Sequence, residues 1–115
     1  RPLNIYVILN SKLYSNNPLD RITAYYTLYD MHIVDIPFLQ ERYKQEENIV
    51  AKRAILKTLS LHHDRELIQF IGDIYELSDK ALKIEMVKII KNKYPEKFDE
   101  FVQKHWVDAQ WIHEE

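Results

Sequence analysis

The segment from Val50 to Ile71, VAKRAILKTLSLHHDRELIQFI, carries two apolar stripes that are separated by a short polar break. The first stripe consists of Ala51, Ile55, Thr58 and Leu59. The second stripe, which extends just beyond the segment, consists of Leu67, Phe70, Ile71 and Ile74. Spacings of three and four residues place side chains on one face of an α-helix, so the segment predicts two amphipathic helices joined by a short turn.

The same pattern recurs along the chain at an interval of 31 residues. The aligned apolar columns are Ala24, Ile55 and Met86; Tyr25, Leu56 and Val87; Leu28, Leu59 and Ile90; Ile36, Leu67 and Phe98; and Leu39, Phe70 and Phe101. In the other direction, the interval aligns Ile5 and Ile8 with Ile36 and Leu39. A repeat of this length is typical of stacked helix pairs, each of which buries its apolar face against its neighbours.

The predicted fold class is therefore all-α, an α-solenoid of antiparallel helix pairs in one domain over residues 1–115. About seven helices are expected near 3–14, 18–31, 35–46, 49–62, 65–77, 79–93 and 95–112. The helix N-caps are expected at Asn17, which precedes Pro18, and at Asn48, Asp64 and Ser78. Short loops between the helices favour antiparallel neighbours.

Residues 17–105 resemble the HEAT-repeat family, most closely in the segment from Val50 to Ile71. The family's basic position is matched by Arg21, Lys52 and Lys83, and its turn aspartate by Asp64. The glycine that is usual in the family is replaced by Tyr29, Ser60 and Lys91, and only Pro37 matches the proline that opens the following helix. The resemblance implies a protein-binding scaffold whose second helices line a concave face.

The composition is that of an ordinary globular domain, with 46% hydrophobic and 30% charged residues in 115. A single glycine disfavours a fold rich in β-hairpins, and the absence of cysteine excludes disulfides and thiolate chemistry. No apolar run is long enough for a membrane span. Because the chain begins at Arg1, we expect a fragment of a longer protein, with apolar groups near Leu3, Ile5, Tyr6 and Val7 left partly exposed.

No residue pattern predicts catalysis, a metal site or a cofactor. His32 and His63 lie in loops at equivalent repeat positions, with His62 beside the latter, but no zinc-binding spacing such as HExxH accompanies them. Cations are favoured at helix C-termini, so we interpret these residues as turn histidines. The adjacent carboxylates Glu46-Glu47 and Asp99-Glu100 would point apart on a helix, and we expect no enzyme.

The aromatic residues indicate contact surface. Tyr26 and Tyr29 fall in columns that hold lysine or serine in the other repeats, so both are expected to be exposed, whereas Tyr25 is expected in the core. Tyrosine and tryptophan are enriched at binding hot spots. Trp106 would either cover the open end of the stack or anchor a partner.

Lysine and arginine concentrate on the predicted second helices, and carboxylates concentrate on the first helix between them. The candidate binding residues are Arg21, Tyr26, Tyr29, Lys52, Arg53, Lys57, Lys83, Lys88 and Lys91. We therefore expect a non-catalytic scaffold that binds an acidic segment of a protein partner on its second-helix face. The alternatives are a nucleic-acid-binding module like the HEAT-like DNA glycosylases, which the net charge of −2 disfavours, and an enzyme resembling the HEAT-like bilin lyases.

Overall fold

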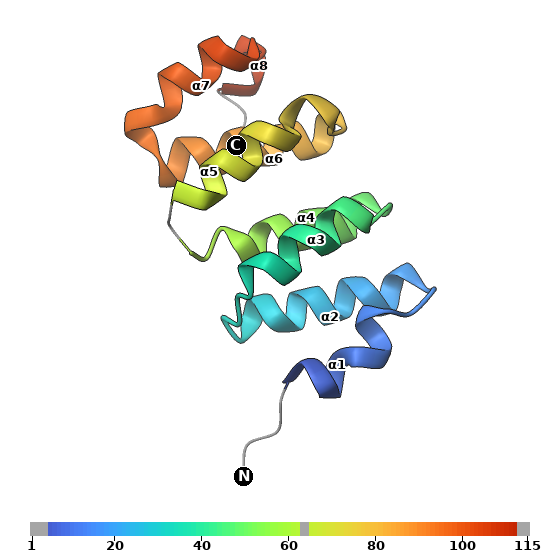
Figure 1. Cartoon of the computed structure of the whole chain (residues 1–115). Helices are drawn as coiled ribbons and strands as arrows, with labels where there is room; N and C mark the ends of the chain where they lie inside the picture. Colours follow the sequence, from blue (N-terminus) through green and yellow to red (C-terminus); the bar gives the residue numbers. More distant parts are fainter. Residues whose placement is uncertain (1–4, 63–64, 113–115) are drawn as a thin grey trace. The chain divides into compact units, whose positions relative to one another are not determined.

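The computed structural model describes residues 5–62 and 65–112, and within these ranges the chain is helical and contains no strand. The α-helices are α1 (Ile5–Leu13), α2 (Pro18–Asp30), α3 (Ile36–Gln45), α4 (Ile49–Leu59), α5 (Arg65–Ile74), α6 (Lys80–Lys93), α7 (Phe98–His105) and α8 (Ala109–Ile112) (Figure 1). Two 3-10 turns, η1 (Tyr75–Leu77) and η2 (Pro95–Lys97), follow α5 and precede α7. The contacts divide the chain into two units, residues 1–61 and 62–115.

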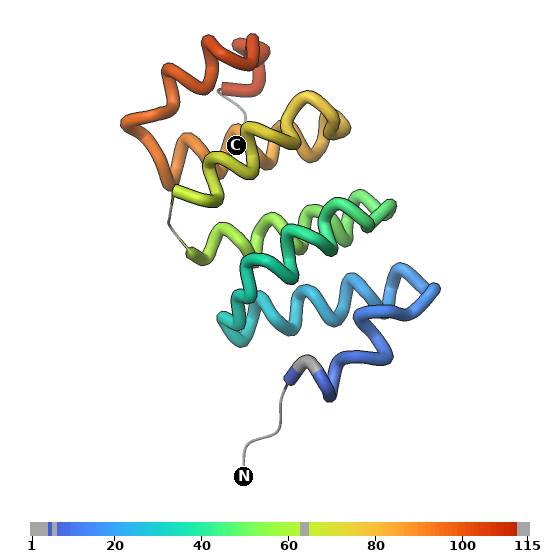
Figure 2. Tube along the Cα trace, in the orientation of Figure 1, coloured from blue at the N-terminus to red at the C-terminus, as the bar shows by residue number. Residues whose placement is uncertain are grey.

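The all-α prediction is confirmed, but the expected helix over 95–112 is wrong. The chain there forms η2, α7 and α8, and the trace turns between α7 and α8 (Figure 2). Trp106 causes the break, because its φ of 52° is left-handed. The amide of Val107 then donates to the carbonyl of Val102 at 3.1 Å, which closes the end of α7.

Unit 1 is organised around the contact between α2 and α4, which is its most extensive. Helix α1 packs on α2, and α3 packs on α4. The side chains that the 31-residue interval aligns in this contact are all buried: Ala24, Tyr25, Leu28, Ile55, Leu56 and Leu59. The apolar faces of the predicted second helices thus form the core of this unit.

Helix α1 departs from the 31-residue register. Ile8, expected to match Leu39, is half exposed, whereas Leu9 and Leu13 are buried. Leu9 precedes the buried Leu39 by 30 residues, and Leu13 precedes the buried Tyr43 by the same interval. One residue turns a helix by about 100°, so this shift moves Ile8 off the buried face.

Unit 2 places α6 against η2, α7 and α8, and α5 continues into η1. Its buried apolar side chains include Ile71, Tyr75, Leu82, Met86, Val87, Ile90 and Phe101. Met86, Val87 and Ile90 are the third members of the columns that are buried in α2 and α4. The repeat pattern therefore predicts burial correctly on α6 as well.

The helix caps are partly as expected. Asn17 accepts from the amide of Leu19, and Asn48 accepts from the amide of Ala51, each at 3.0 Å. Asp64 lies outside the described residues. Ser78 is not an N-cap, because its hydroxyl donates backwards to the carbonyl of Ile74 at 2.8 Å and residue 79 occupies the cap position of α6.

With one glycine in the chain, other residues occupy the left-handed positions that end helices. His32 has a φ of 56°, and its amide donates to Tyr29 while that of Ile33 donates to Leu28. This pair of hydrogen bonds is the Schellman motif. Trp106 is 91% exposed at its own left-handed position, so its indole covers no core. A positive φ is unfavourable for a side chain of this size.

Replacing Trp106 with glycine should stabilise the protein by about 1 kcal/mol, because glycine adopts a positive φ without steric cost and an exposed indole contributes little packing. Urea unfolding followed by circular dichroism measures the change. Gln103→Gly, an exposed site inside α7, is the control and should lose about 1 kcal/mol. A W106G variant that is no more stable than wild type would contradict this explanation of the end of α7.

Candidate functional site

Arg21, one of the predicted binding residues, forms an ion pair with Glu46 inside unit 1. Its Nε donates to Oε1 of Glu46 at 2.8 Å, and its Nη2 donates to Oε2 at 2.9 Å. A third hydrogen bond, from Nη1, reaches the carbonyl of Ser15 at 2.8 Å. The side chain of Glu46 is only 1% exposed and that of Arg21 16%. This bidentate geometry joins α2 to the turn between α3 and α4.

Glu46 also stabilises the turn that leads into α4. Its Oε2 accepts from the amides of Glu47 and Asn48, each at 3.0 Å. Burial alone would raise the pKa of the Glu46 carboxyl, but the hydrogen bonds from Arg21 and from these two amides favour the ionised form. The net pKa of Glu46 lies below its ordinary value.

Lys52 and Lys83, which are 31 residues apart, make the same contact in the two units. The ammonium of Lys52 lies over the ring of Tyr43, 4.8 Å from its centroid. The ammonium of Lys83 lies over the ring of Tyr75 at 5.3 Å. Both rings are buried, so each lysine covers a tyrosine of the preceding helix or turn and gains a cation–π attraction.

The other basic candidates lie on exposed or half-exposed faces of α4 and α6. Arg53 and Lys57 are four residues apart on α4, and Lys88 and Lys91 are three apart on α6. Lys91 also donates to the carbonyl of Ile112 at 2.9 Å. Arg53 and Lys57 thus form a basic face on α4 of unit 1, and Lys88 and Lys91 form a basic face on α6 of unit 2.

Tyr26 and Tyr29 are less exposed than the repeat columns predict. Both side chains are half-buried, and their rings meet edge to face with centroids 6.4 Å apart. Tyr25 is fully buried, as expected, and its hydroxyl accepts from Nε of Arg42 at 3.1 Å. Tyr26 and Tyr29 therefore present part of each ring to solvent on α2.

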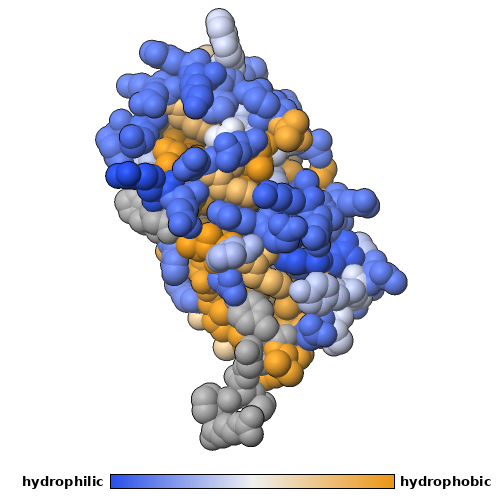
Figure 3. Space-filling view, viewed as in Figure 1, coloured by the Kyte–Doolittle hydropathy of each residue, from blue (hydrophilic) through white to orange (hydrophobic). Residues whose placement is uncertain are grey.

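Apolar side chains remain exposed at the α1 end of unit 1, where hydrophobic surface is visible in Figure 3. Val7 is 73% exposed and Ile8 is half exposed, while Ile5 is half-buried. The exposure expected for Val7 is therefore present. Leu3 lies outside the described residues, as does the side chain of Tyr6.

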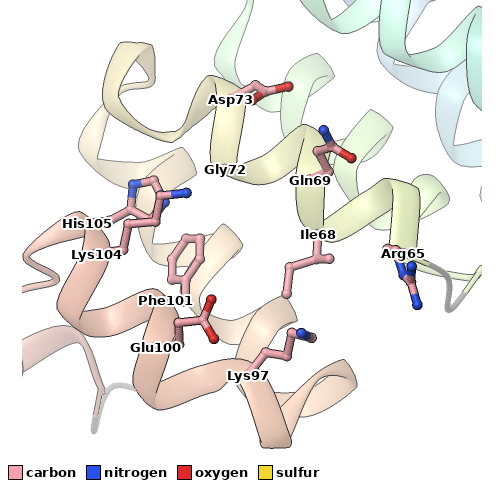
Figure 4. A pocket seen from close by; sticks show the side chains of 10 residues that line it. All are labelled: Arg65, Ile68, Gln69, Gly72, Asp73, Lys97, Glu100, Phe101, Lys104 and His105. Carbon is pink, nitrogen blue, oxygen red and sulfur yellow. The ribbon is translucent and has the colours of Figure 1, made fainter.

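The sequence analysis missed a groove of about 590 Å³ between α5 and α7 in unit 2. Its walls are formed by Arg65, Ile68, Gln69, Gly72, Asp73, Lys97, Glu100, Phe101, Lys104 and His105 (Figure 4). The one sequence feature that pointed to this groove is Gly72, the only glycine of the chain, which lies inside a predicted helix rather than at a turn. The charge pattern drew attention to the second helices, whereas this groove lies between first helices.

Among residues 5–62 and 65–112, no three His, Asp or Glu side chains gather as a metal ion would require. His32 is exposed at the end of α2, and His105 pairs with Glu76 across 3.1 Å. His63 and His113 lie outside the described residues. None of the helices within the described ranges is both long and apolar enough to cross a membrane.

Comparison of the chain with protein-family models, curated proteins and solved structures finds no match. The function proposed below therefore rests on the geometry and chemistry of the chain itself.

Replacing Arg21 with methionine should destabilise the protein by about 3 kcal/mol, because the buried carboxylate of Glu46 loses its counter-charge. The double variant R21M/E46Q should be more stable than R21M, since glutamine removes the unpaired charge and keeps an oxygen for the amide of Asn48. Urea denaturation of the three proteins measures both differences. If R21M alone is as stable as wild type, the ion pair has no structural role.

The loss of unfolding free energy at high pH should depend on Tyr75. Burial, followed by the nearby charges of Glu76 and Asp108, raises the pKa of Tyr75 to about 12. The stability that this shift contributes is complete below pH 10, the unfolded value, and is lost as the pH rises towards 12. By pH 11 the wild type should therefore lose about 1.4 kcal/mol more than Tyr75→Phe, relative to pH 8. Parallel pH profiles of unfolding free energy for the two proteins would exclude this contribution.

Proposed function

We infer that the chain is a non-catalytic interaction module of HEAT-like antiparallel helix pairs, which binds an acidic segment of a protein partner on the exposed faces of α4 and α6. The observation that carries this proposal is the sign of the charge on those faces. Helix α4 contains no aspartate or glutamate. The one carboxylate of α6, Glu85, is buried, so the exposed charges on both helices are basic.

The α4 face combines charge with apolar contact area. On α4, Arg53 and Lys57 share the exposed side with Ile49 and Val50, which are both more than two-fifths exposed. On α6 the basic side chains at i, i+8 and i+11 are Lys80, Lys88 and Lys91. Basic side chains speed the encounter with an acidic segment, and neighbouring apolar side chains provide surface that loses water on contact.

The packing of unit 1 supports the HEAT-like interpretation. In such repeats each first helix packs on its own second helix, and second helices pack on one another. Helix α1 on α2, α3 on α4, and α2 on α4 follow that order. The recurrence of a lysine over a buried tyrosine in both units adds a repeated side-chain contact to the repeated apolar columns.

The seven basic candidates divide by role under this proposal. Arg21 is neutralised by Glu46, and Lys52 and Lys83 cover tyrosine rings, so these three primarily stabilise the fold. Arg53 and Lys57 on α4 and Lys88 and Lys91 on α6 are assigned to recognition because they lie on exposed or half-exposed faces. Tyr26 and Tyr29 are secondary contacts. A net charge of −2 favours a protein partner over nucleic acid, whose binders are usually basic overall.

The double reversal K57E/K88E should slow association with an acidic peptide by about tenfold at low ionic strength and reduce its salt dependence. Stopped-flow fluorescence with a labelled peptide of alternating glutamate and leucine measures the rate. Unfolding free energies should stay within about 0.5 kcal/mol of wild type, because neither side chain is buried.

The matched control is K12E/K44E, which makes the same change in net charge at two exposed lysines on α1 and α3. It should retain most of the wild-type association rate. Equal rates for the two double variants would show that only the net charge matters and would overturn the proposed faces. Tighter, salt-dependent binding of a 20-base-pair DNA duplex (about two helical turns) would favour the nucleic-acid alternative instead.

A further inference from the structure

Two helical faces in unit 2 point toward each other without filling the space between them. Helix α5 contributes Arg65, Ile68, Gln69, Gly72 and Asp73, and the chain from the end of η2 through α7 contributes Lys97, Glu100, Phe101, Lys104 and His105. Each set has the spacing i, i+3, i+4, i+7, i+8, which is one face of a helix. The groove of about 590 Å³ is within the range of small-molecule sites.

The centre of the groove is apolar. Figure 4 shows the ring of Phe101 pointing from α7 towards α5 and the side chain of Ile68 pointing from α5 towards α7. The ring of Phe101 stacks on that of His105, with centroids 4.5 Å apart. These rings and Ile68 form a surface on which an aromatic or other flat apolar group can pack.

One end of the groove contains a buried imidazole nitrogen that has no hydrogen bond to another described residue. The side chain of His105 is only 8% exposed, and its Nδ1 lies 3.1 Å from Oε1 of Glu76. Because a carboxylate only accepts, Nδ1 of His105 is the donor to Glu76, and in the tautomer with a single proton on Nδ1 the Nε2 atom is an acceptor. A buried acceptor without a donor is costly, so a ligand with a hydroxyl group would be favoured there.

Gly72 leaves room in front of that nitrogen. A methyl group on Gly72 would lie 3.8 Å from Nε2 of His105, which is an ordinary contact, so packing does not require glycine. Glycine within a helix is less stable than alanine, and the φ of Gly72 is not positive. Gly72 therefore adds no stability to the fold. Because it has no side chain, Nε2 of His105 is accessible from the groove.

The other end of the groove is cationic. Figure 4 shows Arg65 and Lys97 at the end opposite His105. The nine residues from Arg65 to Asp73 span about 12 Å of helix, which suits a molecule the length of one aromatic ring and a short acidic chain. The rim carries three cationic side chains against two carboxylates, so an organic monoanion is complementary to it.

We propose that the α5–α7 groove binds a small phenolic carboxylic acid. Its ring packs on Phe101 and Ile68, its hydroxyl donates to Nε2 of His105, and its carboxylate lies at Arg65 and Lys97. This site is separate from the basic faces of α4 and α6 and goes beyond the interaction function proposed for them.

The direct test is NMR titration of the whole chain with 3-(4-hydroxyphenyl)propionate. Gly72 is the only glycine, so its amide gives a single glycine resonance that reports on the groove. We expect saturable shifts at Gly72 with a Kd of about 1 mM, as the size of the ligand allows. Phenylpropionate, which lacks the hydroxyl, and 4-propylphenol, which lacks the acid, should each bind about fivefold more weakly.

Two variants locate the contacts. Gly72→Ala should raise the melting temperature by about 3 °C and abolish the preference for the hydroxylated acid, because its methyl blocks Nε2. Lys97→Gln should abolish the preference for the acid over 4-propylphenol, whereas the control Lys80→Gln, outside the groove, should leave it unchanged. The proposal fails if no saturable shift occurs, or if G72A binds all three compounds with the wild-type order of affinities.

Discussion

The buried carboxylate of Glu46 is the constraint on which unit 1 depends. It ends α3, accepts from the amides of Glu47 and Asn48 just before α4, and accepts from Nε and Nη2 of Arg21 on α2. A carboxylate that is 1% exposed is tolerated only when its charge and its lone pairs are satisfied. The position of α2 against α4, which creates the largest contact in the unit, is thereby linked to one side chain.

The basic residue of the repeat has two different structural roles at equivalent positions. On α2 it is arginine, whose planar fork matches a carboxylate. On α4 and α6 it is lysine, whose flexible stem lies across a buried tyrosine and whose ammonium remains near water. A basic residue in this column is therefore a packing element, and the charges proposed for recognition lie at neighbouring positions of α4 and α6.

The two proposed sites use different surfaces and different physics. The faces of α4 and α6 offer basic charges that would act through long-range attraction, and this attraction is screened by salt. The α5–α7 groove offers a short apolar floor, one buried acceptor and a charged end, so it selects by shape and hydrogen bonding. An acidic peptide and a small acid can therefore be tested independently on the same protein.

Local sequence patterns determined the helices, most of their boundaries and the buried columns. The spacing of Ala24, Leu28, Ile55, Leu59 and Ile90 predicts burial because side chains three and four residues apart share a helix face whatever they pack against. The same reasoning found Asn17 and Asn48, since a cap is a contact within one turn.

Only the tertiary structure determines which charges are neutralised by an ion pair and where a groove remains between helices. The partner of Arg21 is 25 residues away, and no periodicity relates it to Glu46. The break at Trp106 depends on a backbone conformation that tryptophan seldom adopts, so its residue type gave no warning. The groove exists because two helix faces about 30 residues apart meet across Gly72, and a void between elements leaves no pattern in either of them.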